Sequence, residues 1–304
     1  MASVIRPDRV DMGVGRAEDT PKDATRESTE QSVYRWVAES PRKLTAADLG
    51  TRISRHFACS RHEAGRMIRS LVAQGRLGYV YLYGQSYIDL SFRRPTPISR
   101  QVVLYPPECA EVPAAGQHAI IIAPGAAFGD GRHPTTRLAV EGLASIWHSS
   151  DGPPQPAFSR GIDIGTGSGI LAIAAARFGV ARVDALDIDP CALSEARLNI
   201  DHNRLGHRIS LQRQPLEALE AMYDLIIANL RLPTLCSIAA WVDHHANPDS
   251  RLVVSGFREP ELAALQGVFP EPTYSLRWSA VQAGWCGAVF QNNRAVGASR
   301  AVRR

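Results

Sequence analysis

Apolar residues near the start of the chain recur with the spacing of helices that have one buried face. In the clearest run, SRHEAGRMIRSLVAQG, every third or fourth position is apolar. Ser60 opens this run and Glu63 follows three positions later, which predicts a capping box at the start of the helix. We expect two shorter helices before it, in SVYRWVAE and LTAADLGTRISRHF, and a hairpin after it, in which YVYLY and YIDLSF pair across a GQS turn. The positions on the predicted buried stripe are Ala64, Met67, Ile68, Leu71 and Val72.

Three short helices followed by a hairpin resemble a winged helix, with Ala58, Cys59 and Ser60 forming the turn of a helix-turn-helix. Two interpretations of this segment stay open. It contacts nucleic acid or another polyanion, or it is a packing or protein-recognition module whose arginines are simply solvated. The residues expected on the exposed side of its last helix are Arg61, His62, Arg66 and Arg69.

Beyond a Pro-rich linker, RRPTP, the pattern changes to an alternation of short apolar strands and amphipathic helices. AIIIAPG reads as a strand and RLAVEGLASIWH as a helix with Leu138, Leu143 and Ile146 on or near its buried side. The later segments GIDIG, RVDALDID, DLIIAN and RLVVSGF read as strands separated by helices. This alternation predicts an α/β fold with a doubly wound, mostly parallel sheet covered on both faces.

These patterns divide the chain into four parts. Residues 1–30 are expected to be a disordered tail by composition, 31–94 a winged-helix-like domain, 95–293 the α/β domain and 294–304 a basic flexible tail.

Composition adds few constraints to this organisation. With 45% hydrophobic and 21% charged residues and a net charge of +4, the chain of 304 residues is typical of a soluble protein and gives only weak support for a polyanionic partner. Its start, MASVIRPDRV, does not resemble a secretory signal, and no run approaches the ~20 apolar residues of a membrane span. Five scattered cysteines without a CxxC pair predict reduced thiols, a cytoplasmic location and no metal site.

The strongest chemical motif is DIGTGSG, which ends an apolar strand and precedes a helix. Gly165 and Gly167 would let a ligand lie against bare main chain, and Gly169 would let the helix pack close to the strand. The spacing is GxGxG rather than the GxGxxG of dinucleotide sites. It therefore favours a cofactor without a pyrophosphate, such as S-adenosyl-L-methionine, although a purely structural glycine turn is the alternative.

Two polar residues at the ends of later strands support a nucleoside site. Asp187 follows Gly165 by 22 residues at the tip of ALDID, where a carboxylate can accept hydrogen bonds from ribose hydroxyls. Asp189 is the rival, but it precedes Pro190 and is better placed to cap the next helix. Asn229 ends DLIIAN on the same edge and is followed by Leu-Arg-Leu, not by the two prolines and aromatic of enzymes that methylate base amines. A buried Asn that caps a turn is the alternative for this position.

DIGTGSGILAIAA, ALDIDP, DLIIAN and PGAAFGDGRHPTTRLAVEGL together resemble the class I S-adenosylmethionine-dependent methyltransferases, and specifically the PrmA-type ribosomal-protein methyltransferases, over about residues 119–291. The resemblance implies a seven-stranded sheet closed by AGWCGAVFQ and methyl transfer to lysines and the terminal amine of a large-subunit ribosomal protein. It places cofactor contacts on Thr136, Gly165, Asp187 and Asn229.

The sequence also departs from that family. Asp130 stands in FGDG where the family usually has Thr, Gln214 stands where many methyltransferases have an acidic residue against the adenine amine, and the loop HSSDGPPQPAFSR is longer than usual. A winged-helix-like segment replaces the family's α+β substrate-recognition module. The resemblance therefore carries over the catalytic class but not the substrate.

Three functions remain in view, and each keeps S-adenosyl-L-methionine as the ligand. The favoured one is a protein methyltransferase with an amine acceptor and a ribosomal protein among its candidate partners. The others are a methyltransferase for RNA or a small molecule, and a nucleic-acid-binding regulator that senses the cofactor. Asp130 and His133 are acid–base candidates by proximity alone, no general base is assigned, and Phe128 is expected to help close the adenosine side.

Overall fold

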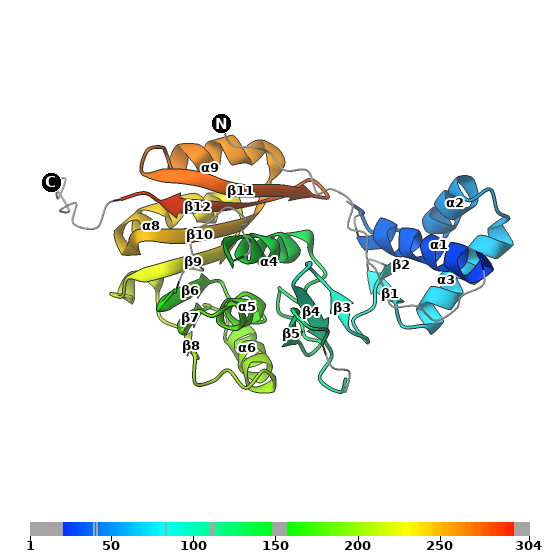
Figure 1. The fold of residues 1–304 in the computed structure, drawn as a ribbon, viewed down its shortest axis with the longest axis horizontal. Coiled ribbons are helices and arrows are strands. Elements are labelled where there is room, and N and C mark those ends of the chain that lie inside the picture. Colours follow the sequence, from blue (N-terminus) through cyan, green and yellow to red (C-terminus); the bar gives the residue numbers. More distant parts are fainter. Residues whose placement is uncertain are drawn as a thin grey trace. The chain divides into compact units, whose positions relative to one another are not determined.

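The computed structural model describes residues 21–38, 40, 42–82, 84–109, 113–147 and 157–294 (Figure 1). They belong to two compact units, which divide between Thr96 and Pro97. The expected basic tail, except for Arg294, lies outside the described residues, as do residues 1–20 of the expected amino-terminal tail and most of the long loop, 148–156.

The smaller unit contains three helices and one hairpin. The helices are α1 (Pro21–Ala38), α2 (Ala46–His56) and α3 (Arg61–Ala73), and the hairpin joins β1 (Leu77–Leu82) to β2 (Gln85–Leu90). Helix α1 begins well before the expected helix, so residues 21–30 are not the disordered tail that their composition suggests. Pro21 suits the first turn of a helix, and the Lys, Ala, Arg, Glu and Gln residues that follow favour helix even without an apolar period.

The start of α3 forms as its local sequence predicts. The Ser60 hydroxyl accepts a hydrogen bond from the Glu63 N–H at 3.2 Å, and the Glu63 carboxylate accepts one from the Ser60 N–H at 2.8 Å, which confirms the capping box. Ala58 turns the chain with a φ of 49°. The hairpin differs from expectation: Leu82 pairs with Gln85 and Tyr81 with Ser86, so Gln85 and Ser86 are strand residues and Gly84, with a φ of 78°, lies at a tighter turn.

The larger unit is built on the predicted mostly parallel seven-stranded sheet, in the order β11-β12-β10-β9-β6-β7-β8. Strand β12 runs antiparallel to both of its neighbours, and the others run in one direction. The strands are β6 (Arg160–Ile164), β7 (Arg182–Leu186), β8 (Ile209–Gln212), β9 (Tyr223–Asn229), β10 (Ala246–Arg258), β11 (Tyr274–Gln282) and β12 (Trp285–Asn292).

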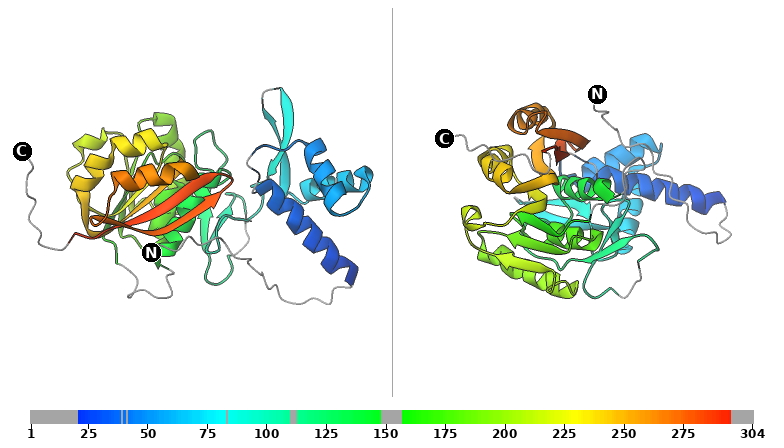
Figure 2. Two further views of the ribbon diagram at one scale, coloured as in Figure 1. Left: turned by 90° about the horizontal axis from the view of Figure 1, so that it is seen from above. Right: turned by 60° about the vertical axis from the view of Figure 1, so that its left-hand side comes forward.

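Helices cover both faces of this sheet (Figure 2). On one face α7 (Leu232–Ser237), α8 (Ala239–His245) and α9 (Leu262–Val268) bury Leu235, Val242 and Leu265 against strand residues such as Ile226 and Val254. The other face carries α4 (Pro134–Trp147), α5 (Ile170–Phe178) and α6 (Pro190–His202). Because both faces are covered, the central strands are almost continuously apolar.

A small three-stranded sheet of β3 (Thr96–Pro97), β4 (Val102–Tyr105) and β5 (His118–Ile121) precedes the main sheet in the chain. Strands β4 and β5 are parallel, and β5 covers the start of the predicted AIIIAPG strand. The segment after β5 leads to α4. It lies against the loop that follows β6, where the Ser168 N–H donates to the Phe128 carbonyl. No helix in the described ranges has the length and apolar composition of a membrane span.

Candidate functional site

The glycine motif forms a tight loop at the carboxyl end of β6. The N–H groups of Gly165 and Thr166 both donate to the carbonyl of Leu186 at 2.8 Å, which ties the loop to the end of β7. Gly167 has a φ of 54°, and a Cβ atom there would lie 2.3 Å from the carbonyl oxygen of Phe128. A side chain is therefore excluded at Gly167 both by backbone conformation and by the segment that lies against the loop.

Asp187 occupies the tip of β7 beside this loop. One carboxylate oxygen accepts a hydrogen bond from the Gly167 N–H at 2.9 Å, and the other accepts one from the Asp189 N–H at 3.0 Å. The next side chain, Ile188, is 82% exposed although it directly follows a buried strand. Asp189 caps α6 by accepting a hydrogen bond from the Cys191 N–H at 2.8 Å, which confirms the role expected for it.

Asp163, the last-but-one residue of β6, lies buried beneath the loop. Its Oδ2 accepts hydrogen bonds from the Thr166 hydroxyl at 2.6 Å and from the Ala172 N–H at 3.1 Å. Burial raises the pKa of this carboxyl to about 7, against the two hydrogen bonds that lower it. Its Oδ1 is buried without a hydrogen-bond partner among the described residues.

Helix α6 holds the segment that leads to the HPTT run. The Glu195 carboxylate accepts hydrogen bonds from the N–H groups of Ala126 and Ala127 at 2.8 and 2.9 Å. The Asn199 side chain accepts one from the Ala123 N–H at 2.9 Å and donates to the Ser168 carbonyl at 2.8 Å. One helix face thus fixes both this segment and the glycine loop.

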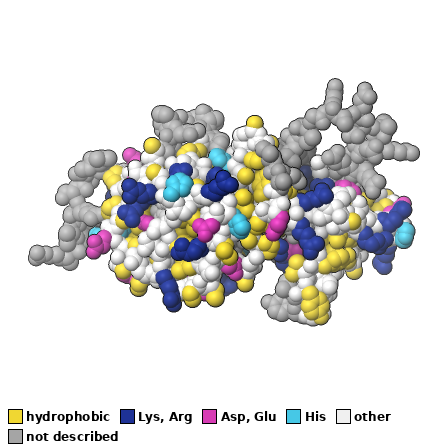
Figure 3. All heavy atoms as spheres, turned by 90° about the horizontal axis from the view of Figure 1, so that it is seen from below, with side chains coloured by type: hydrophobic (Ala, Val, Ile, Leu, Met, Phe, Trp, Pro, Cys, Tyr) yellow, Lys and Arg dark blue, Asp and Glu magenta, His cyan; other side chains and the backbone are white. Residues whose placement is uncertain are grey.

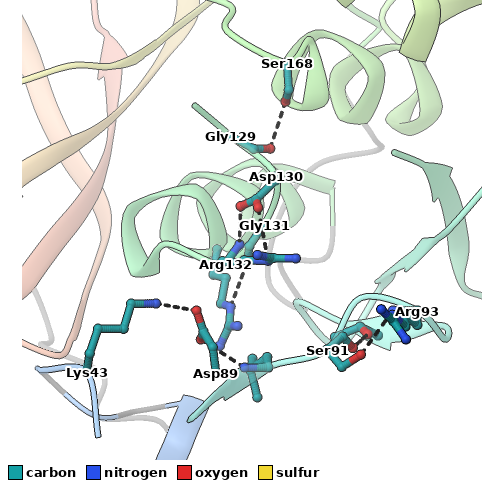
Figure 4. A network of polar contacts seen from close by, with 12 residues as sticks. Lys43, Asp89, Ser91, Arg93, Gly129, Asp130, Gly131, Arg132 and Ser168 are labelled. Carbon is teal, nitrogen blue, oxygen red and sulfur yellow. Dashed lines mark hydrogen bonds and ion pairs between the residues drawn. The ribbon is translucent and has the colours of Figure 1, made fainter. Parts of the chain in front are cut away.

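The middle of the segment lies directly against the glycine loop. Ser168 donates through its backbone N–H to the Phe128 carbonyl at 2.9 Å and through its hydroxyl to the Gly129 carbonyl at 2.8 Å (Figure 4). Asp130 accepts a hydrogen bond from the Arg132 N–H at 3.0 Å and forms an ion pair with its guanidinium at 3.1 Å (Figure 4). Because the Asp130 side chain is 33% exposed, its carboxylate stays accessible to a positively charged group of a ligand.

The first turn of α4 carries the predicted Thr136, which is fully buried. The Ser255 hydroxyl of β10 donates to the Thr135 carbonyl at 2.8 Å, and Ser255 pairs with Asn229 across the neighbouring strand. Among the described residues, Thr136 Oγ1 and Asn229 Oδ1 are both buried without a hydrogen-bond partner.

Aromatic rings surround His133 on the other side of the segment. The His133 ring lies 5.2 Å from that of Phe128 and 4.9 Å from that of Trp285, and the Arg258 guanidinium lies over Trp285 at 3.7 Å. Nδ1 of His133 accepts a hydrogen bond from the Thr135 N–H at 3.3 Å, so a neutral ring carries its proton on Nε2. His133 is therefore poorly suited to act as a general base, and its ring packs between those of Phe128 and Trp285.

Of the predicted site residues, Gly167 binds Asp187 directly and Gly165 binds the carbonyl of Leu186, the residue before Asp187. Asn229 pairs with Ser255, whose hydroxyl binds the carbonyl of Thr135 next to Thr136. Gln214 is exposed beyond the end of β8, and its side chain makes no hydrogen bond within the part of the chain that the structure describes. No cluster of potential metal ligands occurs in the part of the chain that the structure describes. Phe128 is 54% exposed, so it borders the site while its carbonyl binds Ser168.

Sequence reasoning missed four residues of this site. Ile188 could have been found because an apolar residue interrupts the polar end of ALDID. The other three, Glu195, Asn199 and Asn203, recur every four positions along α6, a spacing that places polar side chains on one helix face.

Comparison with known proteins gives a consistent result. The sequence profile described as ribosomal protein L11 methyltransferase (PrmA) matches residues 90–293. The ribosomal protein L11 methyltransferase of Pelobacter propionicus is 34% identical over 198 residues, which make up 65% of this chain and 63% of that protein. That of Trichlorobacter lovleyi is 37% identical over 180 residues, 59% of this chain and 58% of that protein.

A solved structure extends this comparison to three dimensions. The crystal structure of a ribosomal protein L11 methylase from Lactobacillus delbrueckii subsp. bulgaricus superposes with a TM-score of 0.57 at 28% identity, over 66% of this chain and 100% of that one. The chain spans about three fifths of the length of the curated relatives it matches, with 63% and 58% for the two above. The family profile starts at residue 90, which is the last residue of β2. The three helices and the rest of the hairpin of the smaller unit therefore lie before the matched region.

Proposed function

Because this chain belongs to the ribosomal protein L11 methyltransferase (PrmA) family, we propose that it is an S-adenosyl-L-methionine-dependent methyltransferase that modifies amine nitrogens of a protein. Lysine side chains and a terminal amine are the acceptors, and ribosomal protein L11 is the first substrate to test. The observation that carries the proposal is the hydrogen bond between Gly167 and Asp187, which joins a bare glycine loop to a half-buried carboxylate at a parallel sheet edge.

The residues of this edge fit the two ends of the cofactor. Asp187 would accept hydrogen bonds from the ribose hydroxyls, and the exposed Ile188 offers an apolar surface for the adenine ring. Thr136, Asn229 and Asp163 each present a buried oxygen without a partner among the described residues, which suits the cationic methionine end. When bound, the cofactor supplies an activated methyl group and its own leaving group.

The chain's own residues would position the acceptor and exclude water. An amine attacks only when it is neutral, and an apolar surrounding lowers the pKa of a lysine ammonium. Phe128 and Trp285 provide such a surrounding on both sides of His133. In this proposal the Asn229 oxygen would hold the amine in line, while Asp130 would attract the charged form at the rim.

The proposal is tested by incubating the full chain with tritium-labelled S-adenosyl-L-methionine and either purified ribosomal protein L11 of the same organism or fractionated cell lysate. We expect label in a protein band, and methylated lysine or amino-terminal residues after hydrolysis. Asp187→Ala serves as the control and should strongly reduce the label at a cofactor concentration near the affinity of the unmodified protein. Binding of S-adenosyl-L-homocysteine is measured in parallel by calorimetry.

Each other result selects a different function. Label in RNA or in small solutes would contradict a protein acceptor. Saturable cofactor binding without transfer to any fraction would instead support a regulator that senses the cofactor.

A further inference from the structure

We propose that the exposed face of α3 binds the phosphate backbone of a nucleic-acid duplex. This inference is independent of the proposed methyl transfer, since it concerns the smaller unit alone. It starts from the distribution of charge along the chain. Residues 29–96 hold 11 Lys and Arg against 5 Asp and Glu, whereas residues 97–304 hold 18 against 19. The excess positive charge therefore belongs to the smaller unit.

The described acidic side chains of residues 29–96 are already engaged within the unit. Asp48 and Glu63 cap α2 and α3, Glu30 lies 3.8 Å from the Arg76 guanidinium, and Asp89 pairs with Lys43. Glu30 and Asp89 are also buried. The acidic charges that stay exposed on the described surface are those of these two caps, and Glu63 belongs to α3 itself, so this helix carries three arginines against one carboxylate.

Helix α3 separates its buried and basic positions onto different faces. Ala64, Ile68 and Leu71 face the core at helical spacing. Arg66 and Arg69 are exposed, together with His62 one turn earlier, and Arg61 begins the helix. No ion pair to Arg61, Arg66 or Arg69 occurs among the described residues. Lys and Arg side chains, with a histidine, gather on the surface of this unit in Figure 3.

The hairpin adds further groups of the same chemistry. Tyr79 and Tyr81 of β1 are 56% and 71% exposed, and their hydroxyls can donate to phosphate oxygens. The second helix of a helix-turn-helix enters the groove of a duplex, and if α3 takes this position, arginines on its exposed face lie between the two phosphate backbones. A helix fits the wide major groove of DNA better than the deep, narrow one of RNA, so we expect the stronger binding to DNA.

Fluorescence anisotropy of the full chain tests the proposal with a labelled 24-base-pair DNA duplex, the matching RNA duplex and a polyglutamate peptide. The combined variant R61Q/R66Q/R69Q should weaken duplex binding at least tenfold and reduce the slope of log affinity against log salt by about 3. The matched control R182Q/R197Q/R204Q removes the same charge from exposed arginines of the larger unit. It should change affinity less than twofold.

Thermal unfolding verifies that both variants fold. Equal losses in the two variants would overturn the proposal, since only bulk charge would then be involved. A second result would also overturn the proposal: polyglutamate binds, the α3 variant weakens that binding, and the duplexes do not compete with it. The partner would then be an acidic protein. Preference between the DNA and RNA duplexes identifies the source of the phosphates. Methyl transfer by the α3 variant shows separately whether the proposed function is intact.

Discussion

The Asp187 carboxylate and the Gly167 N–H, 20 residues apart in the chain, share a hydrogen bond of 2.9 Å. The tip of β7 thereby fixes the middle of the glycine loop that follows β6. The same carboxylate is fixed on its other side by the Asp189 N–H at 3.0 Å. Its orientation is therefore set before any ligand arrives, which reduces the entropy lost on binding.

Replacing Asp187 by Ala should weaken the binding of S-adenosyl-L-methionine and S-adenosyl-L-homocysteine about 10- to 100-fold, the range expected for losing charge-assisted hydrogen bonds. Calorimetry measures the affinities, and circular dichroism checks the fold. Asp189→Ala is the matched control, because Asp189 caps α6. It should lower the free energy of unfolding by about 1 kcal/mol and leave affinity unchanged. Equal effects on affinity would contradict the ribose assignment.

Gly167→Ala should displace the glycine loop. Its φ of 54° is strained for Ala, and the new Cβ would lie 2.3 Å from the Phe128 carbonyl oxygen. We expect a loss of about 2 kcal/mol or more in the free energy of unfolding, together with weaker cofactor binding. Gly267→Ala in α9 is the control, since its Cβ meets nothing within 4 Å. That change should be neutral or stabilise by up to about 1 kcal/mol. Urea unfolding measures the stability of both variants. Similar stabilities would contradict this prediction and show that the Phe128 backbone moves to make room for the new Cβ.

The buried Asp163 carboxyl should make stability depend on pH. Its pKa is about 7 in the native state against 3.8 ordinarily, so between these values the native protein binds more protons than the unfolded chain. Stability contributed by this group therefore falls as pH rises from about 4 to 7 and then levels off. Asp163→Asn should flatten the dependence, with a difference of up to about 4 kcal/mol across the window. Urea unfolding at several pH values checks this; parallel curves for both proteins would refute it.

Glu195→Ala should release the segment before the HPTT run, because it removes the acceptors of the Ala126 and Ala127 N–H groups. We expect a loss of about 1 to 3 kcal/mol in the free energy of unfolding and faster proteolytic cleavage between residues 124 and 133. Arg197→Ala changes an exposed residue of the same helix and should leave both unaltered. Equal cleavage rates would mean that Asn199 and Ser168 suffice to hold the segment.

The sequence predicts those parts of the site that depend on short-range chemistry. The glycine loop, the cap at Asp189 and the capping box at Ser60 each follow from a few neighbouring residues, and the structure contains all three. The mostly parallel direction of the main strands follows similarly from their alternation with helices, whereas the order of the strands was not predicted. The same local reasoning failed at Pro21, where helix-forming residues outweigh the missing apolar period.

Long-range partners could not be predicted. Asn199 binds Ala123 across 76 residues and Asn203 binds Ile121 across 82, so no window of sequence contains both members of either pair. The hairpin turn failed for a different reason. Gln85 and Ser86 have turn-forming character, but pairing with Leu82 and Tyr81 places them in the strand. Local preference was overridden by register.

Asn203 accepts from the Ile121 N–H at 3.0 Å and donates to the Ile121 carbonyl at 2.7 Å, so its amide completes both backbone groups of one residue. Asp could do only the first and Lys only the second, while Gln would reach too far in a fully packed place. We therefore expect few residues other than Asn to be tolerated at position 203. A library of Asn203 variants selected for folding should return almost only Asn.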